Sequence, residues 1–391
     1  MSLPHSEELP RLRVALIPVF ALMALLFGAI YYLEASPHVP IIIACAVAGL
    51  IGLKLGYTWK HLQDAIVKSI GIALPSILIL MAIGMLIGSW VASGIVPLMI
   101  DYGLKLLSPT YFLVASCFIC AVVSLATGSS WSTIGTVGVA LIGVGQGLEI
   151  HLPMVAGAIV SGSYFGDKLS PLSETTNLAP AVAGSELFEH IKHMLYTTVP
   201  SMLIALTLYL ILGLVYGSSG SDVDKVNALS VSLHKQFNLS PLLLAAPATV
   251  IALIVFKTPA LPAILTGAFV GCLSGIWIQD FTLSEMLTAM LDGYVSETGN
   301  GQIDDLLSRG GMASMDYTIS LILCSMSFGG LMEGTGMLKS IAQSLLNTAH
   351  SAGRIVASTI VTCIGMNIIA PDQCLSIIMP GRMYKGVFKE A

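Results

Sequence analysis

Long apolar runs separated by short polar stretches make up most of this chain. Two runs near its start, residues 14–33 and 39–55, are uncharged apart from Lys54. A helix rises about 1.5 Å per residue, so each run is long enough to cross a hydrocarbon layer of about 30 Å. Similar runs cover residues 71–90, 194–216, 242–256, 260–278 and 317–332, and residues 357–369 begin another. The pattern predicts an all-α polytopic membrane protein with roughly ten membrane segments, some of them incomplete.

Composition agrees with this class of protein. Hydrophobic residues make up 55% of the chain and charged residues 10%, whereas soluble domains carry roughly 25% charged residues. A soluble core could not hide so much apolar surface, so we expect it to face membrane lipid. The net charge of −5 and the lack of a basic block in the sequence argue against a nucleic-acid partner. The seven cysteines are scattered through apolar runs, which favours neither a disulfide scaffold nor a zinc site.

Basic residues predict the orientation in the membrane. Arg11 and Arg13 precede the first apolar run, and Lys54, Lys60 and Lys68 flank the connection after the second. Because lysine and arginine are enriched on the cytoplasmic side, we expect the N-terminus and this connection in the cytoplasm, in a multi-pass protein of the cell membrane. The first run lacks a clean basic region and a small-residue cleavage site, so we expect a retained helix rather than a signal peptide.

Parts of the sequence recur along the chain. The glycine pair of LIGSWVASGIV, Gly88 and Gly94, has a counterpart 242 positions later in FGGLMEGTGML. The stretch GYTWKHLQDAI, from Gly56, resembles DFTLSEMLTAM, 224 positions later, so the later copy would carry 18 extra residues around positions 297–310. Two tandem copies, which we take to be inverted, are typical of secondary transporters that place two gates around one mid-membrane site.

These offsets divide the chain. They predict one transmembrane transporter domain, residues 1–391, with a first repeat at 38–216, a polar linker at 217–238 and a second repeat at 239–391. Position 149 maps onto position 391, so we expect the C-terminal part of the second repeat to be missing and the natural chain to be longer.

The stretch GDKLSPLSETT, residues 166–176, places several polar groups between apolar arms. Pro171 lacks the N–H that would bond the Asp167 carbonyl, so a regular helix breaks here, and Pro180 has the same effect on the carbonyl of Thr176. In lipid, broken backbone is tolerated only inside protein or beside water. Freed carbonyls, the Asp167 carboxylate and nearby hydroxyls are hard oxygen ligands, which together predict a site for Na⁺ or a proton. The hydroxyls are those of Ser170, Ser173, Thr175 and Thr176.

A second polar stretch, SLATGSSWSTIGT, occupies residues 124–136. Thr127, Ser129 and Ser130 belong to its tip, between apolar arms at residues 112–126 and 134–147. Each arm is about as long as a re-entrant segment. We therefore expect a re-entrant hairpin whose hydroxyl-rich tip contributes to the same ion site.

The second repeat has polar residues at the corresponding place. Asn367 precedes Pro371 and Asp372, and Asp372 aligns with Ser130. Pro371 would free the Asn367 carbonyl by the same steric rule. Asn367 and Asp372 are therefore secondary candidates, on a tip that would meet the first one at mid-membrane.

The residues GSYFGDKLSPLSETTNLA, at positions 162–179, resemble the signature of NhaC-type sodium/proton antiporters within the ion transporter superfamily, and the similarity extends over the whole chain. This resemblance implies exchange of Na⁺ for H⁺ across the cytoplasmic membrane and a two-repeat fold with hairpins, and we expect no cofactor. It also implies an ion-site region that contains Asp167, Ser170, Ser173, Thr176 and Asn177. The family includes members that resemble malate/lactate exchangers, so the resemblance leaves the substrate open.

Each candidate residue has a plainer interpretation. Asp167 could be a water-exposed loop carboxylate, although intramembrane acids usually mark ion or proton paths. Lys168 could extend to the membrane surface or pair with Asp167 or Glu174 when no cation is bound, and Glu174 could simply be exposed. The hydroxyls of Ser129 and Ser130 could instead satisfy backbone groups between helices.

Three classes of function compete. In an antiporter, Na⁺ and a proton compete for one mid-membrane carboxylate, and either ion permits the switch between inward-open and outward-open states. An ion-coupled exchanger of small carboxylates would need a cationic contact, for which Lys168 is the obvious base. An enzyme is disfavoured, since the sequence contains no Gly-x-Ser-x-Gly, Walker or His-Glu-x-x-His motif. We expect an antiporter with lipid, Na⁺ and H⁺ as its partners and a homodimer as a candidate assembly.

Overall fold

A computed structural model describes residues 9–106, 108–171, 173–216, 223–256, 258–297, 304, 307–308, 310–346, 352–369, 373, 376–377, 380–381 and 384–385. Within this part, the chain forms helices and no β-strand, which confirms the predicted all-α class. The helices group into two compact units. We call residues 1–77, 178–185 and 317–391 the first unit, and residues 78–177 and 186–316 the second unit.

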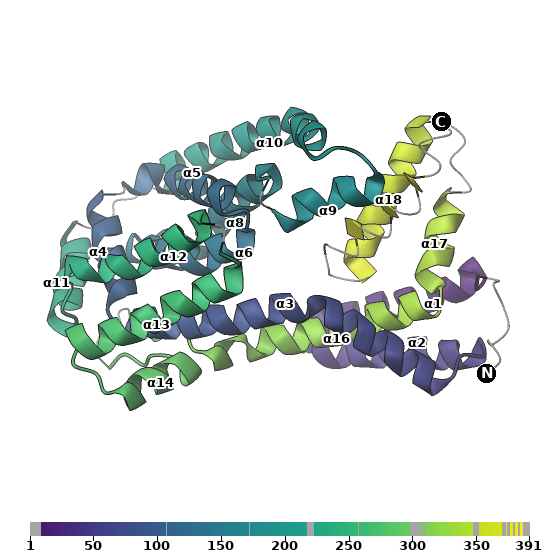
Figure 1. Ribbon diagram of the computed structural model, residues 1–391, viewed down its shortest axis with the longest axis horizontal. Helices are drawn as coiled ribbons and strands as arrows, with labels where there is room; N and C mark the ends of the chain where they lie inside the picture. Colours follow the sequence, from purple (N-terminus) through teal and green to yellow (C-terminus); the bar gives the residue numbers. More distant parts are fainter. Residues whose placement is uncertain are drawn as a thin grey trace. The chain divides into compact units, whose positions relative to one another are not determined.

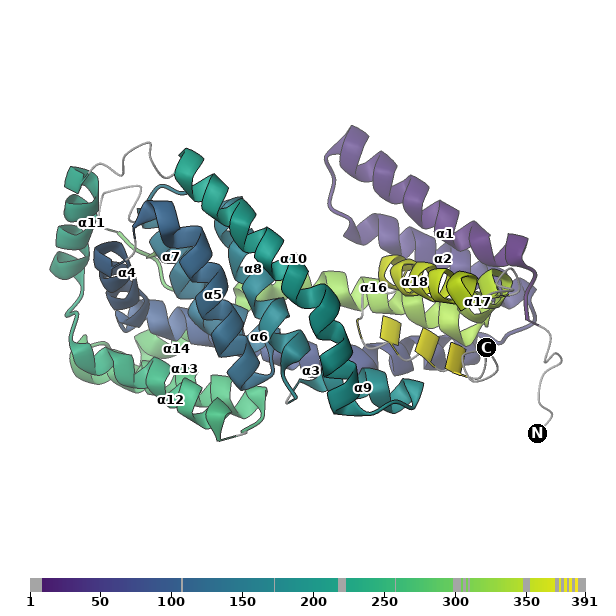
Figure 2. The same ribbon diagram turned by 90° about the horizontal axis from the view of Figure 1, so that it is seen from above.

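The first unit is a group of helices around one hydrophobic cluster. Helix α1 packs beside α2 and α17 (Figure 1, Figure 2). Buried side chains such as Leu62, Phe328 and Met332 belong to its core. Its helices are α1 (Leu12–Phe27), continued by the π-helix η1 (Gly28–Tyr32), α2 (His38–Lys54), the start of α3 (Trp59–Ala92), the end of α9 (Glu174–Ala183), α16 (Asp316–Gly334), α17 (Met337–Leu346) and α18 (Ala352–Ile369).

The second unit holds the two polar stretches identified in the sequence. Helices α5, α8 and α10 lie against one another, and α12 lies beside α13 (Figure 1). It contains the rest of α3 and α9 together with α4 (Ile95–Leu106), α5 (Pro109–Thr127), α6 (Ser130–Thr133), the π-helix η2 (Ile134–Gly138), α7 (Val139–Gly147), α8 (Leu152–Leu169), α10 (Leu187–Tyr216), α11 (Val223–Gln236), the 3₁₀-helix η3 (Pro241–Leu244), α12 (Ala245–Val255), α13 (Ala260–Ile278), α14 (Leu283–Asp292) and the 3₁₀-helix η4 (Met312–Met315).

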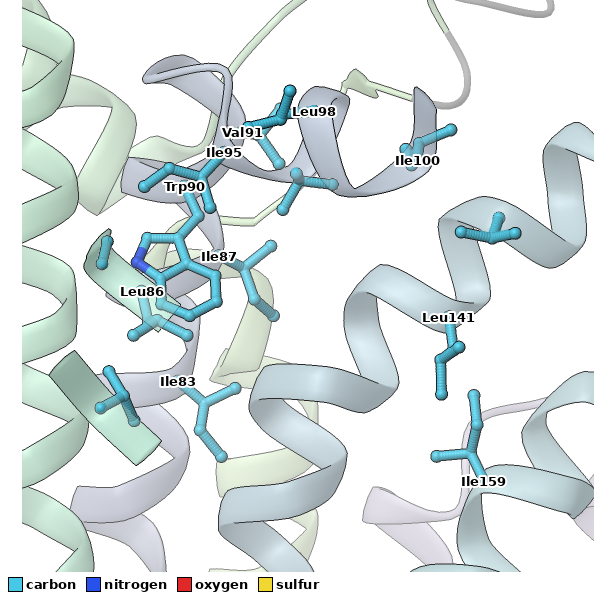
Figure 3. Packing of buried hydrophobic residues seen from close by; sticks show 14 of the residues in the cluster. Ile83, Leu86, Ile87, Trp90, Val91, Ile95, Leu98, Ile100, Leu141 and Ile159 are labelled. Carbon is cyan, nitrogen blue, oxygen red and sulfur yellow. The ribbon is translucent and has the colours of Figure 1, made fainter. Parts of the chain in front are cut away.

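Trp90 of α3 anchors the core of the second unit. Figure 3 shows its indole lying close to Leu86 and Ile87 of the same helix. The indole Nε1 donates a hydrogen bond to the Gly267 carbonyl of α13 at 3.0 Å, so its one polar group is satisfied while the ring is 2% exposed. This contact fixes α13 against α3.

Six helices in the described part are long and apolar enough to cross a membrane, or seven if the bent pair at residues 230–236 and 241–253 counts as one span. The six are Leu12–Tyr32, Trp59–Ala92, Pro109–Ala126, Leu187–Tyr216, Ala260–Ile278 and Met312–Gly334. Large apolar side chains are exposed on them, as at Leu203 and Ile204, which are 60% and 62% exposed. Such surfaces suit lipid rather than water. The number falls below the roughly ten segments predicted because some apolar runs form shorter helices, such as α2 with 17 residues.

Helix boundaries recur at the two offsets found in the sequence. Helices α2 and α13 are each followed by a residue with positive φ, Gly56 (93°) and Asp280 (58°), 224 positions apart. Helices α3 and α16 are likewise followed by Gly94 (80°) and Gly336 (73°), 242 positions apart. We take these matches as support for the proposed tandem repeat. Residues 217–238, proposed as a polar linker, include the helix α11.

Candidate ion-binding site

The polar stretch at residues 166–176 is a break between two helices, as Pro171 predicted. Helix α8 ends at Leu169 and α9 begins at Glu174, and the described residues between them, Ser170, Pro171 and Ser173, lie outside both helices. The Asp167 carbonyl accepts a hydrogen bond from the Ser170 backbone N–H at 3.2 Å. The interruption expected at Pro180 is wrong, because helix α9 continues through Pro180 to Ala183.

Asp167 is buried near the end of α8. Its carboxylate accepts a hydrogen bond from the Ser130 hydroxyl, with 3.0 Å between Ser130 Oγ and Asp167 Oδ2. The two residues are 6% and 1% exposed, although they are 37 positions apart and belong to different helices. The alternative of an exposed loop carboxylate is therefore wrong for Asp167.

The hairpin tip is shaped by its own hydrogen bonds. Helix α5 ends at Thr127 and is capped by Gly128, whose φ of 69° suits a residue without a side chain. Ser129 caps α6, because its Oγ accepts a bond from the Ser132 N–H at 3.2 Å, and Thr133 Oγ1 donates to the Ser129 carbonyl at 3.0 Å. Among the tip side chains that the structure describes, Ser130 donates to the carboxylate. Helix α5 has 19 residues, more than the expected arm, and is itself a candidate span.

Thr176, in the first turn of α9, forms hydrogen bonds with backbone carbonyls at the C-terminal end of α8. Its Oγ1 lies 3.2 Å from the Asp167 carbonyl and 3.0 Å from the Lys168 carbonyl, and it can donate to either. The last carbonyls of a helix lack partners within the helix, so a buried hydroxyl at this place satisfies the end of α8. Thr176 is 3% exposed.

The side chains of Asn177 and Ser173 form hydrogen bonds with backbone groups of the segment between α8 and α9. Asn177 Nδ2 donates to the carbonyls of Pro171 at 2.8 Å and of Ser173 at 2.7 Å. Ser173 Oγ accepts a weak bond from the Thr176 N–H at 3.4 Å. Ser170 and Ser173 are both buried. The predicted ion-site residues therefore lie together, and two of them, Thr176 and Asn177, bind carbonyls of the break.

The secondary candidates have other surroundings. Lys168 is exposed, in agreement with a side chain that extends to the surface. Asn367 belongs to the first unit, where it donates to the Cys363 carbonyl at 3.2 Å and accepts from Ser376 at 2.8 Å. The side chains of Thr127 and Glu174 and the whole of Asp372 lie outside the described residues.

Close packing of α5 against α8 positions the hairpin beside the carboxylate. A side chain at Gly166 would collide with the Ala121 carbonyl, and one at Gly162 would collide with backbone of the same helix α5. Ser124 Oγ donates across the contact to the Ser163 carbonyl at 2.6 Å. We did not predict this contact, although the Gly-x-x-x-Gly spacing is a usual signal for close helix approach in membranes.

The oxygen ligands at this site suit a hard monovalent cation. It offers one carboxylate, buried hydroxyls and backbone carbonyls, which are ligands that alkali ions accept. Among the described residues, no group of three or more His, Cys, Asp or Glu side chains is arranged to hold a metal ion.

Comparison with known proteins agrees with this chemistry. Residues 162–391, which include the helix break and Asp167, match the Na⁺/H⁺ antiporter family. The chain is also 36% identical over 368 residues to the Na(+)/H(+) antiporter NhaC of Alkalihalophilus pseudofirmus, covering 94% of this chain and 79% of that protein. The chain belongs to the Na⁺/H⁺ antiporter family.

Other relatives in the Na⁺/H⁺ antiporter family differ in the substrate that they are named for. An uncharacterized Na(+)/H(+) antiporter of Haemophilus influenzae is 40% identical over 397 residues, covering 100% of this chain and 85% of that protein. A malate-2H(+)/Na(+)-lactate antiporter of Bacillus subtilis is 37% identical over 372 residues, covering 95% of this chain and 80% of that protein. Similarity to the Na⁺/H⁺ antiporter family therefore leaves the carboxylate alternative open, as the signature implied.

Proposed function

We propose that this protein is a secondary antiporter, rather than an enzyme, that exchanges Na⁺ for H⁺ across the cell membrane, with its N-terminus in the cytoplasm. Asp167 is the carboxylate that binds either ion. One observation carries the proposal: a buried Asp167 beside a helix break, with the Ser130 hydroxyl of a hairpin tip 3.0 Å from Oδ2. Membership of the Na⁺/H⁺ antiporter family supports it.

The chemistry follows from burial. A carboxylate that is 6% exposed is costly to leave charged without a compensating partner, so a proton or a cation stabilises it. When Na⁺ binds, the Ser130 hydroxyl can turn its lone pairs toward the ion, and the buried hydroxyls of Ser170 and Ser173 offer further oxygens at the break. Na⁺ and H⁺ are the substrates here, so the proposal needs no cofactor.

Competition for one carboxylate gives exchange. Na⁺ needs the ionised form of Asp167, whereas a proton neutralises it, so the two ions exclude each other. If only the occupied site permits the switch between inward-open and outward-open states, each Na⁺ carried one way requires a proton carried back. The broken helix and the hairpin tip are the elements through which occupancy would be sensed.

The test is exchange in reconstituted vesicles. An acid-inside pH gradient is imposed, Na⁺ is added outside, and an entrapped pH-sensitive dye follows the internal pH. We expect Na⁺ to dissipate the gradient with the unmodified protein and not with Asp167→Asn. Asp64→Asn, which removes an exposed carboxylate from α3, is the control. Unchanged exchange in a folded Asp167→Asn protein would contradict the assignment.

A second candidate function is exchange of small carboxylates coupled to the same ions. The 37% identical relative named for malate, lactate, Na⁺ and H⁺ favours keeping it. Vesicles loaded with lactate and Na⁺ are placed in labelled malate, and uptake of label is measured. Uptake that is lost in Asp167→Asn would assign carboxylate exchange to this site. Na⁺-driven proton movement without malate uptake would favour the first proposal, exchange of Na⁺ for H⁺ alone.

A further inference from the structure

Two buried serine hydroxyls on the helices α5 and α8 have no hydrogen-bond partner. They belong to Ser116 of α5 and Ser163 of α8, which are both 0% exposed, and neither Oγ atom meets a donor or an acceptor among the described residues. Ser124 of α5 is equally buried, but its Oγ donates to the Ser163 carbonyl at 2.6 Å. A buried hydroxyl without a partner lowers stability, so its presence calls for a reason other than folding.

Ser163 lies one helical turn before Asp167. Both residues belong to α8, and positions four apart in a helix share one face, so the two side chains are neighbours. Side chains in a helix lean toward its N-terminus. The Asp167 carboxylate is therefore directed back over the turn that contains Ser163.

This shared face is the one that meets α5 and the hairpin tip. The Ser163 carbonyl accepts a hydrogen bond from Ser124 of α5, and the Asp167 carboxylate accepts one from Ser130 of the tip. The backbones of α5 and α8 are in close contact here, since a side chain at Gly166 would collide with the α5 backbone. The Ser163 hydroxyl is thus enclosed between the two helices, on the same side of α8 as the carboxylate.

The thiol of Cys120, on α5, lies beside Ser163. A thiol is a weak donor and a weak acceptor, and it does not satisfy the Ser163 hydroxyl. Sulfur is also a soft ligand, whereas an alkali ion prefers oxygen. On this side of the carboxylate, the hydroxyl of Ser163 is therefore the side-chain group whose chemistry suits Na⁺.

A cation at the carboxylate would give this hydroxyl a partner. A hydroxyl oxygen carries two lone pairs, which it can turn toward Na⁺ held over the preceding turn of α8. The unfavourable burial of an unpartnered hydroxyl would then be relieved on binding, which adds to the affinity for Na⁺. A proton on Asp167 is held by a covalent O–H bond and needs no second oxygen, so the same hydroxyl favours Na⁺ over H⁺.

We propose that the Ser163 hydroxyl is a further ligand of Na⁺ in the Asp167 site and shifts the competition there from H⁺ toward Na⁺. The proposal rests on the proposed function. It adds a ligand from within α8 to the residues that the sequence predicted, which belong to the hairpin tip and to the region of the helix break.

The experiment measures Na⁺ binding to the purified protein, without transport. Thermal unfolding is followed while NaCl replaces choline chloride at constant ionic strength, and the dependence of the melting temperature on Na⁺ gives an apparent Kd. We expect a Na⁺-specific rise in the unmodified protein that Asp167→Asn abolishes. In Ser163→Ala, the apparent Kd for Na⁺ should rise by about tenfold. In choline chloride, this variant should melt no lower than the unmodified protein, because the hydroxyl that it loses has no partner.

Ser116→Ala is the matched control. It also removes a buried hydroxyl without a partner from the same pair of helices. Ser116 lies eight positions before Ser124, which is about 12 Å along α5 and away from the hairpin tip. Ser116→Ala should therefore melt no lower than the unmodified protein in choline chloride and should keep its apparent Kd for Na⁺.

The dependence on pH gives a second readout. At a fixed Na⁺ concentration, acid should displace Na⁺ from Ser163→Ala at a pH about one unit higher than from the unmodified protein, because tenfold weaker Na⁺ binding is matched by a tenfold lower proton concentration. A purely structural role for Ser163 predicts a lower melting temperature in choline chloride and no such shift.

Three results would overturn the proposal. In two of them, the apparent Kd for Na⁺ of Ser163→Ala stays within about twofold of the unmodified value, or the Kd of Ser116→Ala rises as much as that of Ser163→Ala. Either result leaves the Na⁺ site at Asp167 standing. In the third, the unmodified protein shows no Na⁺-specific rise, which would contradict the ion site itself and this proposal with it.

Discussion

The hydroxyl of Ser130 donates to the carboxylate of Asp167 at 3.0 Å, and this bond joins the hairpin tip to the end of α8. Both side chains are buried, so the bond forms away from bulk water. In such surroundings, loss of one partner leaves the other with an unsatisfied polar group, which is why the two elements depend on each other. The proposed ion site therefore depends on the position of the hairpin tip relative to the helix break.

Ser130→Ala should weaken Na⁺ binding without abolishing exchange. The variant keeps the carboxylate but loses the hydroxyl that donates to it among the residues described. A hydrogen bond or ligand to a charged group is worth about 1.5 kcal/mol, so we expect the KM for Na⁺ in vesicles to rise by about tenfold. Ser201→Ala is the control, because its hydroxyl bonds back to the Thr197 carbonyl on an exposed face of α10. An unchanged KM in Ser130→Ala, or an equal rise in the control, would count against the site.

Asn177→Asp should impair ion exchange, because it disturbs the backbone of the break between α8 and α9. The side chain keeps its size, but a carboxylate oxygen replaces the Nδ2 that donates to the Pro171 and Ser173 carbonyls. Repulsion between these oxygens would open the break, so we expect the exchange rate to fall by at least about tenfold. Asn238→Asp makes the same chemical change at an exposed position and should exchange normally. A wild-type rate in folded Asn177→Asp would show that these bonds are dispensable.

Local rules predicted the break and the class of fold well. Pro171 located the interruption between α8 and α9, because a proline ring removes a helix hydrogen bond within a few residues. The same rule failed at Pro180, which lies inside α9. The apolar run at residues 260–278 matches α13, since its length and composition alone define the helix. The hairpin tip around Ser130 was predicted from its hydroxyls between apolar arms.

Contacts between distant residues could not be predicted in the same way. The sequence predicted both Ser129 and Ser130 as ion-site residues without distinguishing them. Ser130 rather than Ser129 donates to Asp167 because the turn makes Ser129 the N-terminal cap of α6. Thr176 and Asn177 were predicted as ion ligands, but which oxygens they meet depends on how the break folds back. The polar composition of residues 217–238 suggested a linker and hid the helix α11.

Gly166→Ala should destabilise the protein and reduce exchange together. Its new methyl group would meet the Ala121 carbonyl and the Leu125 N–H of α5, and backbone atoms cannot move aside as a flexible side chain can. Overpacking of this kind costs about 1–3 kcal/mol and would shift the tip relative to Asp167. Melting temperature and vesicle exchange measure the two effects. Gly49→Ala, in α2, adds a methyl group with nothing within 4 Å and should be neutral or slightly stabilising. Equal behaviour of the two variants would contradict the packing argument.

Asp101 links α4 to α11 and should make stability depend on acid pH. Lys105 Nζ donates to its Oδ2 at 2.7 Å, Ser230 Oγ donates to Oδ1 at 2.5 Å, and His234 Nε2 lies 3.4 Å from Oδ2. Burial acts to raise the pKa of Asp101, but the bonds from Lys105 and Ser230 and the positive charge nearby outweigh it, so the pKa lies below the ordinary 3.8. Neither α4 nor Asp101 belongs to the candidate membrane spans.

The sign of this effect follows from the lowered pKa. The folded protein holds the ionised form of Asp101 more tightly than the unfolded chain does, so the stabilisation is complete above pH 3.8 and is lost as the pH falls through the lower folded value. Asp101→Asn removes the charge at every pH. At pH 7 we expect the free energy of unfolding of Asp101→Asn to be about 1–3 kcal/mol lower than that of the unmodified protein. This gap between the two proteins should close as the pH drops below the ordinary pKa of 3.8. Thermal unfolding of both proteins between pH 7 and pH 3 measures the gap, and a gap of constant size would mean that the ion pair does not stabilise the contact between α4 and α11.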